Sequence, residues 1–141
     1  MKHKKWITVL MLLFVPLIAA AQLAPTERIV MQVPFKFTVG NVAIPGGEII
    51  VQSANEQGSL LLLRNRDARV SVFTLPAKAR SNKAAPVTAM VFHKYGDRYF
   101  LTGLKIGASN AVYEFRQSKL EKEFEAQNLH PTQEVLRAST N

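Results

Sequence analysis

Few residues in this sequence are able to do acid–base or metal chemistry. After residue 3 its histidines are His93 and His130, and it has no cysteine, which excludes disulfides and thiolate sites. His93 lies in a segment whose pattern predicts a strand. Three interpretations of it are open: a metal ligand, a general base, or a structural residue whose ring nitrogen bonds to backbone or water. A zinc site needs three or four converging ligands, and Asp97, in a turn four residues further on, does not aim at the same point. We expect no metal and no cofactor, and a small hydrolase or isomerase using His93 stays an alternative.

Sequence motifs of known catalytic machinery are absent. No G-x-S-x-G segment is present to place a nucleophilic serine. The Pro-Gly-Gly of residues 45–47 lacks the lysine and the following helix of a phosphate loop. A glycosidase needs two carboxylates across a cleft, and the acids of the β-region are Glu48, Glu56, Asp67 and Asp97. The last three fall in predicted turns, so we predict no catalytic residues.

Two groups of basic and aromatic residues are candidates for ligand binding. The first lies in the acid-free break at residues 76–86 and consists of Lys78, Arg80 and Lys83. The second flanks the Gly-Asp pair at residues 96–97 and consists of Lys94, Tyr95, Arg98 and Tyr99. Cations pair with acidic groups and aromatic rings stack on sugars, so both groups suit an anionic envelope polymer. The alternative is that the loop is simply exposed and that the rings pack across strands.

Period-two alternation predicts the strands that carry these residues. Apolar and polar residues alternate from Met31 to Val39, and Pro34 within this run is typical of an edge strand. Further short strands are expected at residues 48–54, 60–63, 69–75, 87–95, 98–106 and 111–115. The four leucines of residues 60–63 indicate a central strand that is buried on both faces.

The pair Gly96-Asp97 predicts a two-residue hairpin turn, with the glycine at a position of positive φ. This turn fixes three cross-strand pairs: His93 with Phe100, Lys94 with Tyr99, and Tyr95 with Arg98. Strict alternation then gives two faces, one with Val91, His93, Phe100, Leu104 and Ile106, the other with Met90, Phe92, Tyr99 and Leu101. Both faces are apolar, so we expect the hairpin to lie inside a sheet or under a cover.

A short helix is expected over residues 118–127, because Ser118 and Glu121 have the spacing of a capping box. Leu120 and Phe124 fall on one face, which we expect to dock on the sheet because a helix of this length is not stable alone. The charged residues, Glu121 among them, are expected on the other faces. The polar residues 128–141 are expected to form a flexible tail.

The first 21 residues have the pattern of a secretory signal peptide. A basic start at residues 2–5 precedes an apolar run over residues 6–18, and three alanines allow cleavage between Ala21 and Gln22. Cleavage removes three lysines and lowers the net charge from +8 to +5. No apolar run of ~20 residues remains, so we expect no transmembrane span after cleavage. Residues 22–27 are expected to form a loose leader, and the protein is expected in the periplasm or outside the cell.

Three short segments of the chain together carry a resemblance to other proteins. They are Val33–Asn41 (VPFKFTVGN), Pro45–Glu48 (PGGE) and Phe92–Leu101 (FHKYGDRYFL). Together they resemble a family of small exported β-rich proteins from Acidobacteria-type bacteria, over roughly Val33 to Glu125. The resemblance implies export and one β-rich domain, and it brings no activity, cofactor or site residue with it.

The expected fold is one all-β, mainly antiparallel domain over residues 28–127. It is a single β-sandwich or partly open barrel of about seven strands with one C-terminal helix. The expected function is that of a non-enzymatic binding or envelope-associated module, whose partner is an anionic envelope polymer or another envelope protein. Nucleic acid is not expected, because no recognition helix or aromatic-basic motif is present. A structural subunit that assembles through an exposed edge strand near Pro34 is a further alternative.

Overall fold

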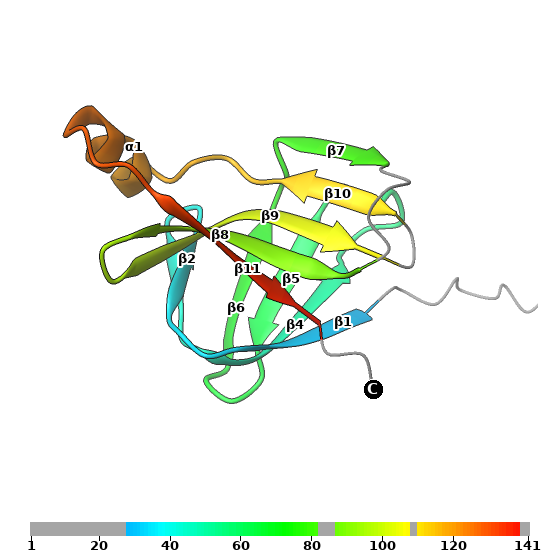
Figure 1. Ribbon diagram of the computed structural model, residues 1–141. Coiled ribbons are helices and arrows are strands. Elements are labelled where there is room, and N and C mark those ends of the chain that lie inside the picture. The colour runs from blue at the N-terminus through cyan, green and yellow to red at the C-terminus, as the bar shows by residue number, and fades with distance from the viewer. Residues whose placement is uncertain (1–27, 82–86, 108–109, 139–141) are drawn as a thin grey trace, which may run out of the picture.

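The computed structural model describes residues 28–81, 87–107 and 110–138, whose arrangement is shown in Figure 1. Within these ranges the chain forms eleven strands and one helix. They are β1 (Arg28–Val33), β2 (Phe37–Val39), β3 (Val42–Ile44), β4 (Gly47–Ser53), β5 (Leu61–Asn65), β6 (Val70–Thr74), β7 (Lys78–Ser81), β8 (Ala89–Tyr95), β9 (Arg98–Ile106), β10 (Ala111–Glu114), α1 (Lys119–Ala126) and β11 (Thr132–Arg137). The expected all-β class with one C-terminal helix is confirmed. The expected signal peptide with its Ala21–Gln22 cleavage point, the leader and Lys83 lie outside the described residues.

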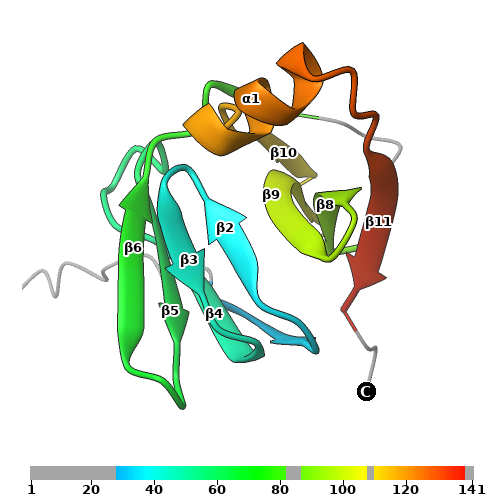
Figure 2. The same ribbon diagram turned by 90° about the vertical axis from the view of Figure 1, so that its left-hand side faces the viewer.

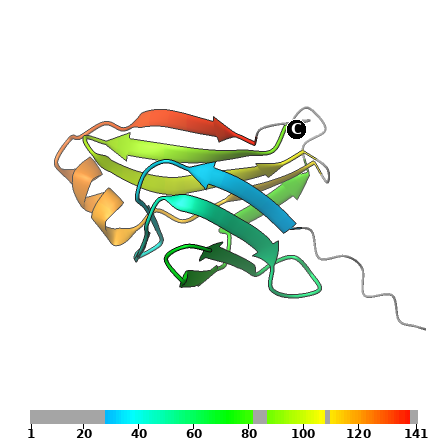
Figure 3. The ribbon, with the colours of Figure 1, turned by 90° about the horizontal axis from the view of Figure 1, so that it is seen from below.

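The strands form two sheets that face each other across the core (Figures 2 and 3). The first sheet has the order β1-β4-β5-β6, and the second has the order β11-β8-β9-β10-β7. Pairs along both sheets are antiparallel, and the β2–β3 hairpin joins the second sheet through a short parallel pairing of β2 with β9. The helix α1 covers one end of this arrangement (Figure 2). In the part of the chain that the structure describes, the strands close into no complete barrel, and no helix has the length and apolarity to cross a membrane.

The core lies between the two sheets and is built from the inward positions of both. Its fully buried side chains include Ile49 and Leu63 from the first sheet and Met90, Phe92 and Leu104 from the second. Phe92 also makes edge-to-face contacts with Phe35 and Phe37, at ring-centroid distances of 5.0 and 5.3 Å. Burial of each such side chain contributes about 1.5–3 kcal/mol, so the core holds the domain together without disulfides.

The predicted Gly96-Asp97 hairpin is confirmed, with Gly96 at a φ of 58°. The register of β8 and β9 pairs Tyr95 with Arg98, Lys94 with Tyr99, and His93 with Phe100, as the turn predicts. The β8 strand lies between β11 and β9, and α1 packs over the His93 side, so the hairpin is both inside a sheet and under a cover.

Beyond Leu101 the expected division of the hairpin into two faces is wrong. A β-bulge shifts the register, because Phe92 pairs with Leu101 while Val91 pairs with Gly103, which leaves Thr102 as an extra residue. Leu104 and Ile106 therefore join the core on the Phe92 side, not on the His93 side. The Thr102 hydroxyl donates to the Val91 carbonyl at 3.2 Å and holds the bulge in place.

Two predictions about strands in the N-terminal half of the domain also need correction. The run from Met31 to Val39 is divided at residues 34–36, because Pro34 cannot donate to a ladder, and its two parts belong to different sheets. β1 is at an edge of the first sheet, as expected. The leucine-rich strand β5 is central, but it alternates: Leu61 and Leu63 are buried, whereas Leu62 between them is partly exposed.

The expected flexible tail is wrong for residues 132–137, which form β11. This strand pairs with β8 over six consecutive positions, from Thr132 with Lys94 to Arg137 with Ala89. Its side chains are mostly exposed, and Leu136 alone among them packs against the core. Main-chain pairing along β8 gives β11 its order, and a polar sequence does not reveal that pairing.

Asn65 at the end of β5 organises the turn that follows it. The residue is fully buried. Its amide donates to the carbonyls of Pro45 and Gly46, at 2.7 and 3.2 Å, and its side-chain oxygen accepts from the amides of Asp67 and Ala68, both at 2.9 Å. One side chain thus joins the β3–β4 connection to the β5–β6 turn.

We expect Asn65→Ala to lower the free energy of unfolding by about 2–3 kcal/mol, because it removes all four hydrogen bonds that this fully buried side chain makes. Urea denaturation followed by circular dichroism measures the change. The matched control is Gln57→Ala in an exposed turn, which is expected to stay within about 0.5 kcal/mol of the parent. Equal midpoints for the two variants would contradict this role of Asn65.

Candidate functional site

The helix α1 is fixed to the second sheet by a buried carboxylate. Ser118 caps the helix, and its hydroxyl accepts from the Glu121 amide at 3.0 Å, as the capping-box spacing predicts. The Glu121 side chain is 1% exposed, whereas the sequence placed it on a solvent face. Glu121 lies three residues before Phe124, so both side chains face the sheet from one side of the helix.

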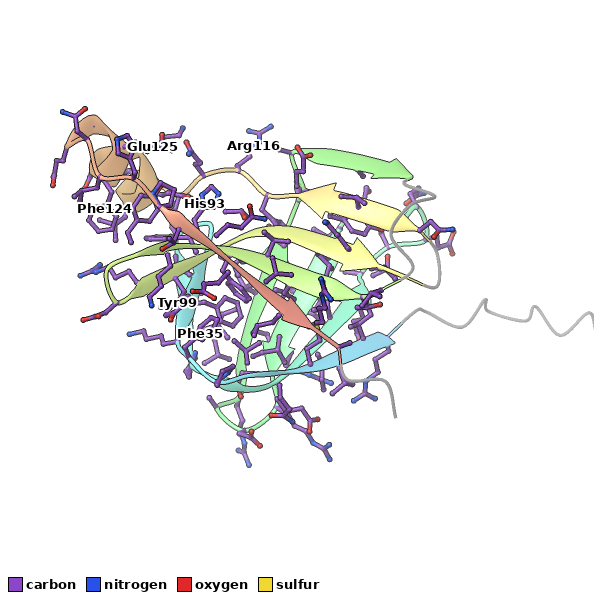
Figure 4. The ribbon with its side chains drawn as sticks, viewed as in Figure 1. Phe35, His93, Tyr99, Arg116, Phe124 and Glu125 are labelled. Carbon is purple, nitrogen blue, oxygen red and sulfur yellow. The ribbon has the colours of Figure 1, made fainter. Side chains whose placement is uncertain are left out.

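The Glu121 carboxylate bonds to two side chains of β8. Its Oε1 lies 2.7 Å from His93 Nδ1 and accepts from the Tyr95 hydroxyl at 3.4 Å. Phe124 packs beside them against the rings of Tyr95 and Phe100, at centroid distances of 5.4 and 6.1 Å. Figure 4 shows His93 below the helix that carries Phe124 and Glu125. The hydrogen bonds of this carboxylate and an aromatic cluster therefore dock α1 together.

The His93–Glu121 pair meets the structural requirement of the alternative hypothesis, a hydrolase or isomerase that uses His93. A hydrolase or isomerase using His93 needs that ring in an open site beside a carboxylate, and burial of His93 against Phe100 would remove the hypothesis. The His93 side chain is 32% exposed, and the carboxylate beside it comes from a helix 28 residues away in sequence. The signal that could have found Glu121 is the polar ring of His93 on an apolar face, which needs a partner from whatever covers that face.

A charged groove opens on the other side of the β8–β9 turn. It has a volume of 610 Å³ and lies between the β2–β3 hairpin, that turn and the start of α1. Its charged lining residues are Lys36, Asp97, Arg98, Lys119 and Glu123, and its polar ones include Thr38 and Asn41. The Asn41 side-chain oxygen accepts from the Lys119 amide at 3.5 Å, which joins the hairpin to the helix. Among the described residues, no ion pair engages any of these five charges.

The four candidate residues around the hairpin turn are divided between two faces. Tyr95 is buried under α1, and the Arg98 guanidinium lies 5.9 Å from the ring centroid of Phe124. Tyr99 is on the opposite face, stacked on Phe35 at 3.7 Å between centroids, with the Lys94 ammonium 5.4 Å from its ring (Figure 4). Arg98 and Tyr99 line the charged groove, but the Tyr99 ring is occupied by these two neighbours.

The other candidate group lies elsewhere in the second sheet. Lys78 and Arg80 are on β7, where their backbone positions pair with Glu114 and Val112 of β10. β7 is separated from β8 by β10 and β9 in the strand order. The described structure therefore does not bring the two predicted groups into one site.

Comparisons with known proteins leave the site to be interpreted from its own geometry. No protein-family model matches the chain, no curated protein is similar to it, and no solved structure matches its fold. Over residues 28–81, 87–107 and 110–138, no three His, Asp or Glu side chains are grouped to hold a metal ion.

The phenol of Tyr95 reports on the docked helix. Burial, together with the nearby negative charges of Glu121 and Glu125, raises the pKa of Tyr95 to about 12. A tyrosine in an unfolded chain ionises near ~10, so the unfolded state releases this proton first as the pH rises. The neutral phenol therefore contributes its full stability below about pH 10 and loses it as the pH rises through the folded-state value.

We expect a spectrophotometric titration of the folded protein to contain a tyrosinate component near pH 12 that is missing from Tyr95→Phe. The difference between the two titration curves isolates this one phenol. If the difference curve instead rises near pH ~10, as for free tyrosine, then Tyr95 does not sit beside a buried carboxylate.

Proposed function

We propose that this protein is an exported binding module that takes a segment of an acidic cell-envelope glycan into the charged groove. The observation that carries the proposal is the groove itself, a space of 610 Å³ with five charged side chains in its lining. A volume in this range is typical of sites for small ligands or short polymer segments. The secretory pattern of the first 21 residues supports export to a compartment that contains such polymers.

The chemistry of the lining favours an acidic, hydroxylated ligand. Lys36, Arg98 and Lys119 supply three cations that can pair with carboxylates. Asp97 and Glu123 can accept hydrogen bonds from sugar hydroxyls. Both kinds of group occur together in a glycan with uronic acids.

The mode of binding differs from stacking on an aromatic platform. The Tyr99 ring is engaged within the protein by Phe35, which stacks on it at 3.7 Å between centroids, and by the Lys94 ammonium, 5.4 Å from its centroid. The ring is thereby fixed at the groove wall, and recognition falls to charge-assisted hydrogen bonds. Such binding weakens as salt screens the charges.

The test is calorimetric titration of the protein with a uronic-acid oligosaccharide. We expect the double variant Lys36→Gln/Lys119→Gln to bind at least about tenfold more weakly, since two charge-assisted contacts are lost. The control is Lys122→Gln, an exposed lysine of α1 outside the groove, which is expected to bind as the parent does.

A second comparison separates the groove from overall basicity. The triple variant Lys78→Gln/Arg80→Gln/Lys83→Gln removes three charges from the other predicted group. We expect it to keep most of the affinity. Equal affinity of parent and groove variant, or binding that does not change between low and high salt, would contradict the proposal.

A further inference from the structure

The outer face of the second sheet carries a hollow that shares no lining residue with the charged groove. The hollow has a volume of 220 Å³ and is lined by residues that include His93, Gly103, Lys105 and Gln133. Gly103 contributes space, because a Cβ at this position would stand 3.5 Å from the Tyr113 carbonyl oxygen and from Val91 Cβ. The hollow suits a small group rather than a polymer segment.

The His93 ring is oriented at the hollow by Glu121. A carboxylate only accepts hydrogen bonds, so the His93 Nδ1–H donates to it across 2.7 Å, and the neutral ring keeps its lone pair on Nε2. Nε2 is on the side of the ring away from Glu121. Because the side chain is 32% exposed and lines the hollow, this lone pair is accessible to water there.

Gln133 adds a hydrogen-bond donor beside His93. The register of β11 and β8 places Gln133 directly opposite His93, so both side chains project from the same face of the sheet. Both line the hollow. A side-chain amide N–H next to a general base can stabilise an oxyanion that forms within its reach.

We propose that His93 and Glu121 form a general-base dyad that hydrolyses small esters, such as acetyl esters, in this hollow. His93 Nε2 takes a proton from water while the water oxygen forms a bond to the ester carbonyl carbon, and the carbonyl electron pair moves to its oxygen, where the Gln133 amide donates. The adduct collapses, the carbon–oxygen bond to the alcohol breaks, and the departing alkoxide takes the proton from His93. The products are one acid and one alcohol, and the ring returns to its neutral form.

In this reaction Glu121 is a positioning residue. It holds the ring by Nδ1 and offsets the positive charge that His93 carries between the two proton transfers. Its removal is therefore expected to slow turnover without weakening substrate binding. This inference is independent of the glycan groove, because the two sites use different residues.

The test follows the release of p-nitrophenolate from p-nitrophenyl acetate by the full chain. We expect His93→Gln to lower kcat by at least about 100-fold, the usual contribution of a general base. The matched control is His130→Gln, which removes an exposed histidine outside the hollow and is expected to leave kcat unchanged. Equal kcat for the parent and His93→Gln, or a parent rate no higher than that of imidazole at the same concentration, overturns the proposal.

Two further variants test the dyad and the hollow separately. We expect Glu121→Gln to lower kcat about tenfold or more with KM unchanged, whereas Glu134→Gln, at an exposed position of β11 outside the hollow, changes neither. Gly103→Ala adds a methyl group at ordinary contact distance, so the protein folds and KM rises. A parental circular dichroism spectrum and urea midpoint for each variant show that it is folded. A variant Gly103→Ala with parental KM would place the reaction outside the hollow.

Discussion

The position of α1 on the second sheet depends on one buried carboxylate, that of Glu121. Glu121 is almost completely buried, and it is compensated by His93 and Tyr95 of one strand. An uncompensated buried charge costs several kcal/mol, so α1 has one favourable position on the sheet. That position also sets one wall of the charged groove, through Ser118 and Lys119. Two surfaces on different sides of the hairpin therefore share a single anchor.

The β8–β9 hairpin serves both surfaces because its two faces have different covers. On one face Tyr95 and Phe100 meet α1, and on the other Tyr99 meets Phe35. Cations follow the same division, since Arg98 lies over Phe124 of the helix and Lys94 over Tyr99. Aromatic residues beside cations were the basis for a sugar-binding interpretation of the sequence. In the structure most of their ring area is used for contacts within the protein.

Local patterns in the sequence predicted local structure well. The Gly96-Asp97 pair determines both a turn and a register, and Ser118 determines a helix start, because each depends on neighbours within four residues. Two of the errors concern interactions between distant segments. The pairing of β11 with β8 and the burial of Glu121 depend on contacts across 28 or more residues, which alternation and propensity do not encode. The candidate site was therefore found only in part: His93 could be named, but its carboxylate, its hollow and the charged groove could not.

Thr102 illustrates how much depends on a single extra residue in a strand. Side chains along a strand point alternately to the two faces of the sheet. The extra residue at Thr102 reverses this alternation in the middle of β9. Before it, Phe100 belongs to the helix side; after it, Leu104 and Ile106 belong to the core between the sheets. β9 thus contributes Phe100 to the cluster under α1 and Leu104 and Ile106 to the core between the sheets. Strict alternation would have placed all three side chains on one face. Gain or loss of one residue at the bulge would consequently exchange the two faces of half of the strand.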